Sequence, residues 1–258
     1  MTAFGNLLKE WRKIRRFSQL QLALEADVSA RHISFLESGR ANPSKAMVMR
    51  LTQALAMPRP AANQAFHSAG FAPAYPDIPA GARAIAPINK AMEMVLAGHD
   101  PFPGVAVDRH WNIIAANRGA SMLLSLLPSN TEPNMIALLI AAADSKLIEN
   151  WEEVATLSLI RLRSEINDLG GDPALSVIAE RLAGHRRVAA VELGNIRYDK
   201  AVIPSIFCFD DIRLSLFSMI AQFGSVQDIR AGELRIELMF PTDDATESWF
   251  LAPAALPR

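Results

Sequence analysis

Apolar residues recur at helical spacings through the first 70 positions, and no strand pattern interrupts them. These positions include Leu20, Ala23, Ile33, Leu36, Val48, Leu51 and Leu55. A serine stands immediately before each of three amphipathic segments, at Ser18, Ser29 and Ser44. A serine side chain there accepts a hydrogen bond from a free amide of the first helical turn. The region is therefore predicted to consist of short helices separated by tight turns.

The composition changes at residues 70–81, which contain three prolines and two glycines in a dozen positions. Residues of these two types at that density interrupt regular structure, so they mark a linker or domain boundary. The length of 258 residues also exceeds the usual size of a single hydrophobic core. We therefore predict two domains, at 1–70 and 84–258, joined by a linker at 71–83.

Beyond this linker, helical and extended patterns alternate. Helices are predicted at 84–97, 117–127 and 151–168, with further starts at 133–134 and 172–173. Strands are predicted at 104–107, 111–115, 201–209, 213–222 and 233–240. In the last strand apolar residues alternate with Glu233, Arg235 and Glu237, which predicts burial of one face only. The second domain is therefore predicted to be α+β, with an antiparallel sheet assembled from strands at both of its ends.

Composition narrows the class of protein. Half of the residues are hydrophobic and 21% are charged, which excludes an intrinsically disordered chain and indicates a soluble globular one. The longest apolar run, residues 135–143, is about half of what crosses a bilayer, and the amino terminus lacks an export signal. Cys208 is the single cysteine, so no internal disulfide or thiolate metal site is expected. These features predict a cytoplasmic protein without a membrane segment.

The charges are unevenly distributed along the chain. Residues 1–60 carry ten lysines and arginines against four acidic residues, a net charge of +6, whereas the remainder carries −7. A small basic region joined to a larger acidic one is typical of a polyanion-binding module attached to a second domain of another function. We call residues 1–60 the head and the remainder the body.

Residues 18–40 have the pattern of two helices joined by a tight turn. The small Ala23 lets the second helix approach closely, 27–29 form the turn, and Ile33 with Leu36 gives the second helix one inward stripe. At about 100° per residue, Arg31, Ser34 and Phe35 are turned outward, and Ala30 and His32 flank them near the amino end of the helix. An exposed arginine in the first turn can donate two hydrogen bonds to a guanine edge, and a phenylalanine can contact a thymine methyl.

These segments resemble the xenobiotic-response-element (XRE) helix-turn-helix family, which includes the phage Cro and repressor domains. The resemblance covers residues 4–57 and is carried by Ser-Gln-x-x-Leu-Ala, Val-Ser-x-x-x-Ile-Ser and Leu-Glu-x-Gly-Arg, in order and spacing. It implies a five-helix, lambda-repressor-like all-α domain that binds double-stranded DNA. By family position, bases would be faced by Ala30, Arg31 and Phe35, and phosphates by Gln19, Ser38 and Arg40.

The family position also implies that Arg12 pairs with Glu37 as an internal strut. One departure is Asp27, where the family's turn usually has glycine; aspartate tolerates a left-handed backbone better than most residues. Taken singly, arginines such as Arg31 and Arg40 are more often solvated surface residues than base or phosphate contacts. Together with the motif and the positive head, we interpret them as DNA contacts.

The second domain resembles the MmyB-type ligand-binding domain of bacterial regulators over about residues 85–245. The residues that carry this resemblance are 102–117, Trp151, Leu162-Arg163 and 171–173. It implies a PAS-like fold, in which helices fold over one face of an antiparallel sheet and enclose an apolar cavity. It also implies a small hydrophobic ligand, and the family is associated with fatty-acid-like molecules.

Several residues are candidates for contacts with such a ligand. Arg161 and Arg163 could meet a carboxylate, and Trp111 could form a wall. Segments rich in Met and Phe suit an adaptable apolar pocket, although such stripes also serve as ordinary core. The candidate ligand-binding residues are Trp111, Asn117, Arg161, Arg163, Phe207 and Phe217.

Catalytic and metal-binding motifs are not found in the sequence, and the five histidines are scattered without ligand spacing. We therefore expect no cofactor and no metal, and interpret the chain as a transcription regulator rather than an enzyme.

A homodimer is expected because one head reads only a few base pairs. Its interface is expected in the second domain, because residues 1–60 offer little spare apolar area. Two alternatives stay open: an enzyme whose helix-turn-helix only regulates its own gene, and a ligand-free protein whose second domain binds another chain.

Overall fold

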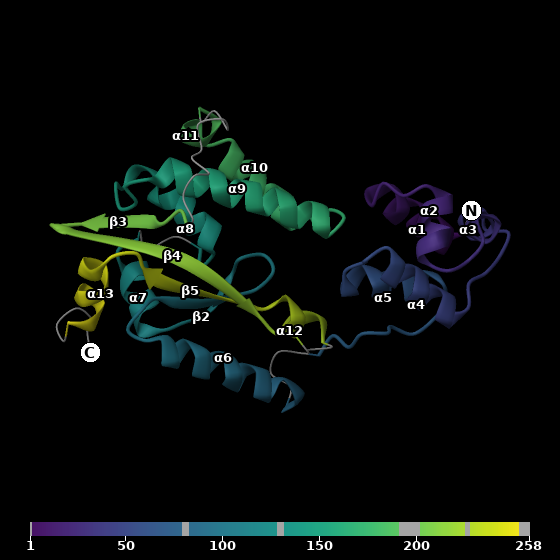
Figure 1. The fold of residues 1–258 in the computed structure, drawn as a ribbon, viewed down its shortest axis with the longest axis horizontal. Helices are drawn as coiled ribbons and strands as arrows, with labels where there is room; N and C mark the ends of the chain where they lie inside the picture. Colours follow the sequence, from purple (N-terminus) through teal and green to yellow (C-terminus); the bar gives the residue numbers. More distant parts are fainter. Residues whose placement is uncertain (1, 79–82, 128–131, 191–201, 225–227, 253–258) are drawn as a thin grey trace. The chain divides into compact units, whose positions relative to one another are not determined.

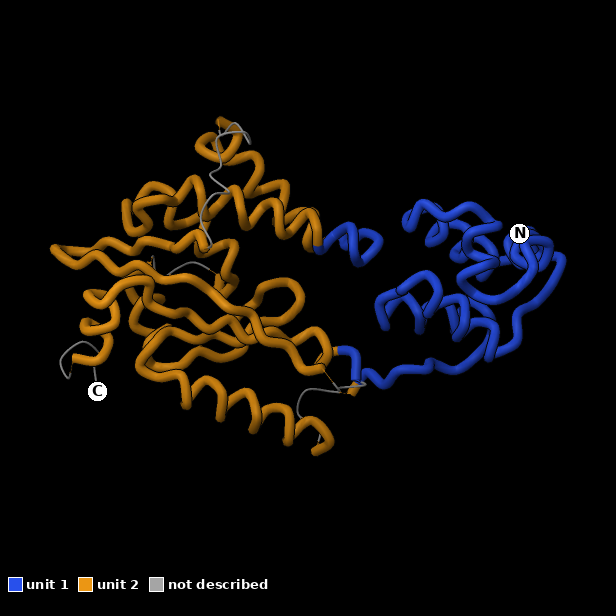
Figure 2. Tube along the Cα trace, in the orientation of Figure 1, with its two compact units in different colours: residues 1–77, 165–172, 227–229 blue, residues 78–164, 173–226, 230–258 orange. Residues whose placement is uncertain are grey.

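The computed structural model describes residues 2–78, 83–127, 132–190, 202–224 and 228–252. The chain divides into two compact units (Figure 2). Unit 1 consists of 1–77 with the short segments 165–172 and 227–229. Unit 2 consists of 78–164, 173–226 and 230–258. No helix in the described ranges is long and apolar enough to cross a membrane.

Residues 2–78 fold into five helices, as predicted for the amino-terminal region (Figure 1). They are α1 (Ala3–Ile14), α2 (Gln19–Glu25), α3 (Ala30–Ser38), α4 (Lys45–Ala54) and α5 (Arg59–Ser68). The three predicted helix starts are confirmed, because the hydroxyls of Ser18, Ser29 and Ser44 each accept a hydrogen bond from the amide three residues on. At Ser18 the Gln21 side chain returns the bond and completes a capping box.

The predicted tight turn between α2 and α3 is present. Asp27 adopts a left-handed backbone with φ 51°, so aspartate takes the conformation for which the family uses glycine. Ala23 is buried at the helix contact, and Ile33 and Leu36 are fully buried. The helix-turn-helix geometry and the inward stripe of α3 are confirmed. The core of this region is formed by Phe4, Leu8, Trp11, Leu22, Ala23, Ala26, Ile33, Leu36, Val48, Leu51, Leu55, Ala65 and Phe66.

The predicted strut between α1 and α3 is also confirmed. Arg12 Nε lies 2.6 Å from Glu37 Oε1, and Arg12 Nη2 lies 3.1 Å from Oε2. Glu37 is 4% exposed, and Gln19 Nε2 donates to its Oε2 at 2.8 Å. Burial alone would raise the pKa of Glu37, but the hydrogen bonds from Arg12 and Gln19 hold it below its ordinary value of 4.5. An ionised carboxylate therefore joins the first three helices.

The first part of the predicted linker is held by α5. Asn63 Oδ1 accepts hydrogen bonds from the amides of Ala74 and Tyr75, and its Nδ2 donates to the Tyr75 carbonyl at 2.8 Å. Residues 71–77 consequently belong to unit 1. Residues 79–82 of the predicted linker lie outside the described residues.

The remaining chain contains helices and strands in the predicted α+β mixture. The strands are β1 (Gly104–Val107), β2 (Ile113–Ala116), β3 (Ser205–Phe209), β4 (Ile212–Gln222) and β5 (Arg235–Pro241). The helices are α6 (Ala86–His99), α7 (Arg118–Ser125), α8 (Met135–Ala141), α9 (Trp151–Asp168), α10 (Pro173–Ala183), α11 (Arg186–Ala189), α12 (Ile229–Glu233) and α13 (Asp244–Leu251), with short 3-10 turns at Arg83–Ile85 and Ala142–Asp144. Every predicted strand segment contains an observed strand; the last begins two residues late because α12 extends to Glu233.

The five strands form one antiparallel sheet in the order β2-β1-β5-β4-β3. The last strand in the chain, β5, is therefore the central one. The prediction that β5 is buried on one face only is wrong: Ile236, Glu237 and Leu238 are all buried in succession. A central strand is covered on both faces, whereas the alternating pattern suggested that Glu237 faces water.

Helices lie on both sides of this sheet (Figure 1). Met92 and Leu96 of α6 pack against Ala106, Ile236 and Leu238 on one face. On the opposite face, the sheet meets α7, α8 and α9 around a cavity. The resemblance implied helices over one face of the sheet, as α7, α8 and α9 are, but α6 covers the other face as well.

The side chain of Asn117 fixes how three of these elements meet. Its Oδ1 accepts hydrogen bonds from the amides of Gly104 and Ala120, each at 2.9 Å. Its Nδ2 donates to the carbonyls of Leu96 at 3.1 Å and Phe102 at 2.8 Å. All the polar atoms of this buried amide are thereby engaged, and they tie the last turn of α6, the start of β1 and the start of α7 together.

We predict that Glu37→Gln destabilises the protein by about 3 kcal/mol, because the substitution leaves the Arg12 guanidinium enclosed without its counter-charge. Since the pKa of Glu37 is lowered by folding, its contribution is complete above the unfolded value and is lost as the pH falls through the lower folded value. Urea unfolding of the wild type and the variant, measured from pH 7 down to pH 3, checks both effects. The exposed Glu10 on α1 supplies the matched control Glu10→Gln, and equal losses in the two variants would contradict the strut.

Candidate DNA-binding helix and ligand cavity

The outward face of α3 carries the residues predicted to contact bases. Arg31 is exposed, while Ala30, Ser34 and Phe35 are half-buried. Ile33 and Leu36 point into the core, so α3 is oriented as its apolar spacing predicted. Ser29 is the N-cap of α3, so Arg31, two residues later, lies in the first turn of the helix.

Two arginines flank the Phe35 ring. The Arg31 guanidinium carbon lies 5.2 Å from the ring centroid, and that of Arg40 lies 5.9 Å from it. These are distances at which a guanidinium is attracted to an aromatic ring. The single acidic residue of α3, Glu37, faces inward and is paired with Arg12. The exposed face of α3 is therefore cationic, and its aromatic ring lies close to two guanidiniums, that of Arg31 on the helix and that of Arg40 just after it.

The other two predicted phosphate contacts have internal partners. Gln19 Nε2 donates to Glu37, but an amide nitrogen has two hydrogens, so one stays available to a phosphate. The exposed Ser38 donates its hydroxyl to the Phe35 carbonyl at 3.2 Å. Gln19 thus also helps to position the helix that carries Arg31, whereas the Ser38 bond lies within that helix.

A cavity of about 150 Å³ lies in unit 2 between the sheet and helices α7, α8 and α9. Its wall is mostly apolar, and an engineered cavity of about this size in another protein holds a benzene molecule. Space of this kind favours a small hydrophobic ligand. Apolar wall residues include Val105, Leu123, Met135, Ile136, Leu139, Ile148, Val154, Phe207 and Met239.

Trp111 is a buried part of the wall, and two arginines lie close to its ring. The guanidinium carbon of Arg161, on α9, lies 4.5 Å from its ring centroid, and that of Arg235, on β5, lies 5.3 Å away. Trp111 has a left-handed backbone with φ 66°, a conformation rare for a bulky residue. The turn before it is fixed by Asp108, whose Oδ1 accepts from the amides of His110 and Asn112. The turn and the arginines together set the position of the indole.

The cavity brings together three of the six predicted ligand residues: Trp111, Arg161 and Phe207. The other three are not among the residues that line it. Asn117 is engaged in the four hydrogen bonds described above. Arg163 is exposed, and Phe217 stacks on Phe240, at 5.6 Å between ring centroids, on the face of the sheet that α6 covers.

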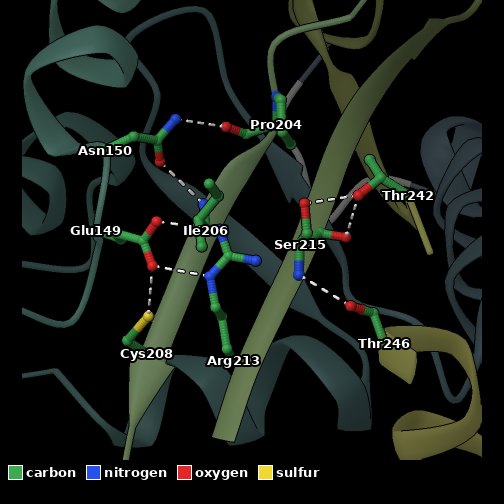
Figure 3. A network of polar contacts seen from close by, with 9 residues as sticks. All are labelled: Glu149, Asn150, Pro204, Ile206, Cys208, Arg213, Ser215, Thr242 and Thr246. Atoms are coloured by element: carbon green, nitrogen blue, oxygen red, sulfur yellow. Dashed lines mark hydrogen bonds and ion pairs between the residues drawn. The ribbon is translucent and has the colours of Figure 1, made fainter. Parts of the chain in front are cut away.

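The strand that carries Phe207 is anchored to the start of α9 by polar contacts (Figure 3). Asn150 Nδ2 donates to the Pro204 carbonyl at 2.8 Å, and Asn150 Oδ1 accepts from the Ile206 amide at 3.0 Å. Arg213 donates to both carboxylate oxygens of Glu149, and these bonds hold the pKa of Glu149 below its ordinary value. Because Ser205 and Phe207 lie beside these anchors, the cavity wall from β3 is fixed relative to the wall from α9.

Sequence reasoning missed the acidic residue of this wall. Glu237 lines the cavity from β5 and is 9% exposed. Its alternation with Met239 and Arg235 places all three on one face, but the pattern alone assigned that face to solvent. A signal was available in Met239, which interrupts the polar series on that face. Within the described ranges, no group of three His, Cys, Asp or Glu side chains could hold a metal ion.

Family models match both parts of the chain. A helix-turn-helix family model matches residues 8–59. A model of the MmyB-like transcription regulator ligand binding domain matches residues 88–251, which is more than half of the chain. No curated protein matches the sequence. Both predicted resemblances are confirmed, and the chain belongs to the MmyB-like transcription regulators, in which a DNA-binding helix-turn-helix precedes a ligand-binding domain.

Proposed function

We propose that this regulator reads its operator as a homodimer through α3 and that a small, largely hydrophobic molecule in the cavity changes its DNA binding. The observation that carries the proposal is the placement of Arg31 and Arg40 around Phe35 on the exposed face of α3. The two-domain division at 1–70, 71–83 and 84–258 is part of this proposal, with the head for DNA and the body for the ligand.

The proposed roles on α3 follow from side-chain chemistry. Arg31 stands in the first turn, from which a guanidinium can donate two hydrogen bonds to a guanine edge. Phe35 offers its ring to a thymine methyl, and Ala30 and Ser34 border the same face. Phosphates are contacted by Arg40, Ser38 and the second amide hydrogen of Gln19.

We predict that Arg31→Ala weakens binding to the best operator by about 1 to 3 kcal/mol and relaxes the preference at one base pair. Arg40→Ala is the matched comparison, because a phosphate contact lowers affinity for all sequences alike and reduces the salt slope by about one. Fluorescence anisotropy over a randomised operator panel at several salt concentrations separates the two. The assignment of Arg31 fails if its removal leaves base preference unchanged.

The proposed ligand is fatty-acid-like, with an apolar body in the cavity and a carboxylate at Arg161. Each methylene removed from water contributes about 0.8 kcal/mol, so a short chain that fills the cavity can still bind measurably. A guanidinium in the wall supplies charge-assisted hydrogen bonds to a carboxylate. Because the cavity measures about 150 Å³, a chain of about eight carbons is the natural probe.

We predict that octanoic acid raises the thermal unfolding temperature of the full chain and that Arg161→Gln weakens its binding about tenfold or more. Arg163→Gln is the matched control, since Arg163 lies on the same helix but is exposed and outside the cavity wall. Calorimetric titration of the three proteins measures the affinities. Equal losses in both variants would place the carboxylate away from Arg161.

A homodimer gives the ligand a way to act on transcription. Two heads must reach two half-sites together, so a ligand that favours one arrangement of the heads changes operator affinity. It must bind the two arrangements unequally, because equal affinity shifts nothing. We propose that the interface lies in the second domain. In residues 1–60 the exposed large apolar residues are Leu20 and Leu24 of α2, at 61% and 74% exposure, within the described residues. Exposed apolar residues in unit 2 include Met94 and Val95 on α6.

We predict that light scattering at micromolar concentration gives twice the monomer mass. Leu24→Glu and Met94→Glu each introduce a charge at an exposed apolar position, one in each unit. The variant that lies in the interface shifts the equilibrium towards monomer, because a charge in an apolar contact is desolvated without a partner. A monomer mass for the wild type, with and without operator DNA, would contradict the dimer.

A further inference from the structure

Glu237 is an acidic residue in the wall of an otherwise apolar cavity. It lies on the central strand β5, two positions from Arg235, which packs on Trp111, and two from Met239, which also lines the cavity. The alternation of a strand therefore directs all three side chains to the cavity face. Its neighbours on the adjoining strands, Val105 and Ile220, are apolar.

No hydrogen bond or ion pair reaches the Glu237 carboxylate from the part of the chain that the structure describes, although the residue is only 9% exposed. Of the serines in the wall, Ser158 donates its hydroxyl to the Val154 carbonyl of its own helix at 2.8 Å. Ser205 and Ser218 form no hydrogen bond with Glu237 either. The Glu237 carboxylate is thus a hydrogen-bond acceptor for which the described residues supply no donor.

An apolar ligand alone would make this arrangement unfavourable. Water in the empty cavity can solvate a carboxylate, but a hydrocarbon that fills the cavity displaces that water and supplies no donor. A buried acceptor left without a partner costs free energy, more so when it is charged. The ligand that fits best therefore brings its own donor to Glu237.

We propose that the cavity selects a short acyl compound that carries a hydroxyl or amino group on its chain, and that this group donates a hydrogen bond to Glu237. The proposal rests on the proposed ligand function and deepens it. Arg161 reaches the cavity from α9, where it packs on Trp111, whereas Glu237 reaches it from β5. Among the described residues, no hydrogen bond or ion pair joins Arg161 to Glu237, so each of them can hold a different polar group of the ligand. The donor is therefore a group on the chain of the ligand and not its carboxylate.

Selectivity of this kind comes from the unpaired group in the protein. A site that is built to hydrogen-bond a hydroxyl rejects the analogue that lacks it, because the protein group then stays unsatisfied. With an apolar residue at position 237, the cavity has no acceptor for the ligand hydroxyl and does not bind the hydroxylated compound preferentially. The preference, rather than the affinity itself, is the quantity that reports on Glu237.

The test compares octanoic acid with 3-hydroxyoctanoic and 8-hydroxyoctanoic acid by calorimetric titration of the full-length protein. We expect at least one hydroxylated acid to bind the wild type about tenfold or more tightly than octanoic acid. In Glu237→Leu the preference disappears and octanoic acid binds more tightly than it does to the wild type. In Glu237→Gln, which keeps a neutral acceptor, part of the preference stays. Glu180→Leu, at an exposed position of α10 outside the cavity wall, leaves the wild-type preference unchanged.

The outcomes separate this inference from the function beneath it. If all three acids bind the wild type equally well, or if the preference persists in Glu237→Leu, the inference is overturned while the ligand function stands. If none of the acids binds although operator binding is intact, the proposed ligand function fails and this inference fails with it. Operator binding by each variant verifies that the chain is folded.

Discussion

The buried Asn117 amide holds three elements of unit 2 in one arrangement. Its four hydrogen bonds fix where α6 ends, where β1 begins and where α7 begins. Gly104 and Val105 of β1 and Ala120 and Leu123 of α7 all line the cavity. Asn117 therefore shapes a binding space that it does not touch, because a buried amide with every polar atom engaged admits only one arrangement of its partners.

In unit 1 the elements are joined by a charged pair, Arg12 and Glu37, and not by a neutral amide. A carboxylate on α3 would oppose the approach of a polyanion if it faced outward. Glu37 is instead turned into the core, where Arg12 and Gln19 satisfy it. The buried Glu37 therefore has two effects. Its hydrogen bonds join the helices, and its burial keeps a negative charge off the outer face of α3.

Local rules predicted the parts of this fold that depend on neighbours in sequence. Ser18, Ser29 and Ser44 were identifiable as caps because the bond spans three residues, and Ile33 with Leu36 defined the inward face of α3. Glu237 was assigned to the wrong environment because its burial depends on the position of β5 between β1 and β4, which alternation within one strand does not encode. Phe217 illustrates the same limit, since which face of a sheet encloses the cavity is decided by helices distant in sequence. Trp111 was identified within the segment that carries the family resemblance, and Arg161 was identified because a guanidinium can meet a carboxylate. Neither followed from apolar spacing.

The arrangement around Phe35 has a thermodynamic consequence for the encounter with DNA. A long arginine side chain on an open surface samples many rotamers and loses that freedom when it binds. Here the Phe35 ring already attracts the guanidiniums of Arg31 and Arg40 before any DNA is present. Part of the side-chain entropy is thus given up during folding. In the proposed contacts with DNA, less of it is then left to lose at binding, and more of each contact's energy is expressed as affinity.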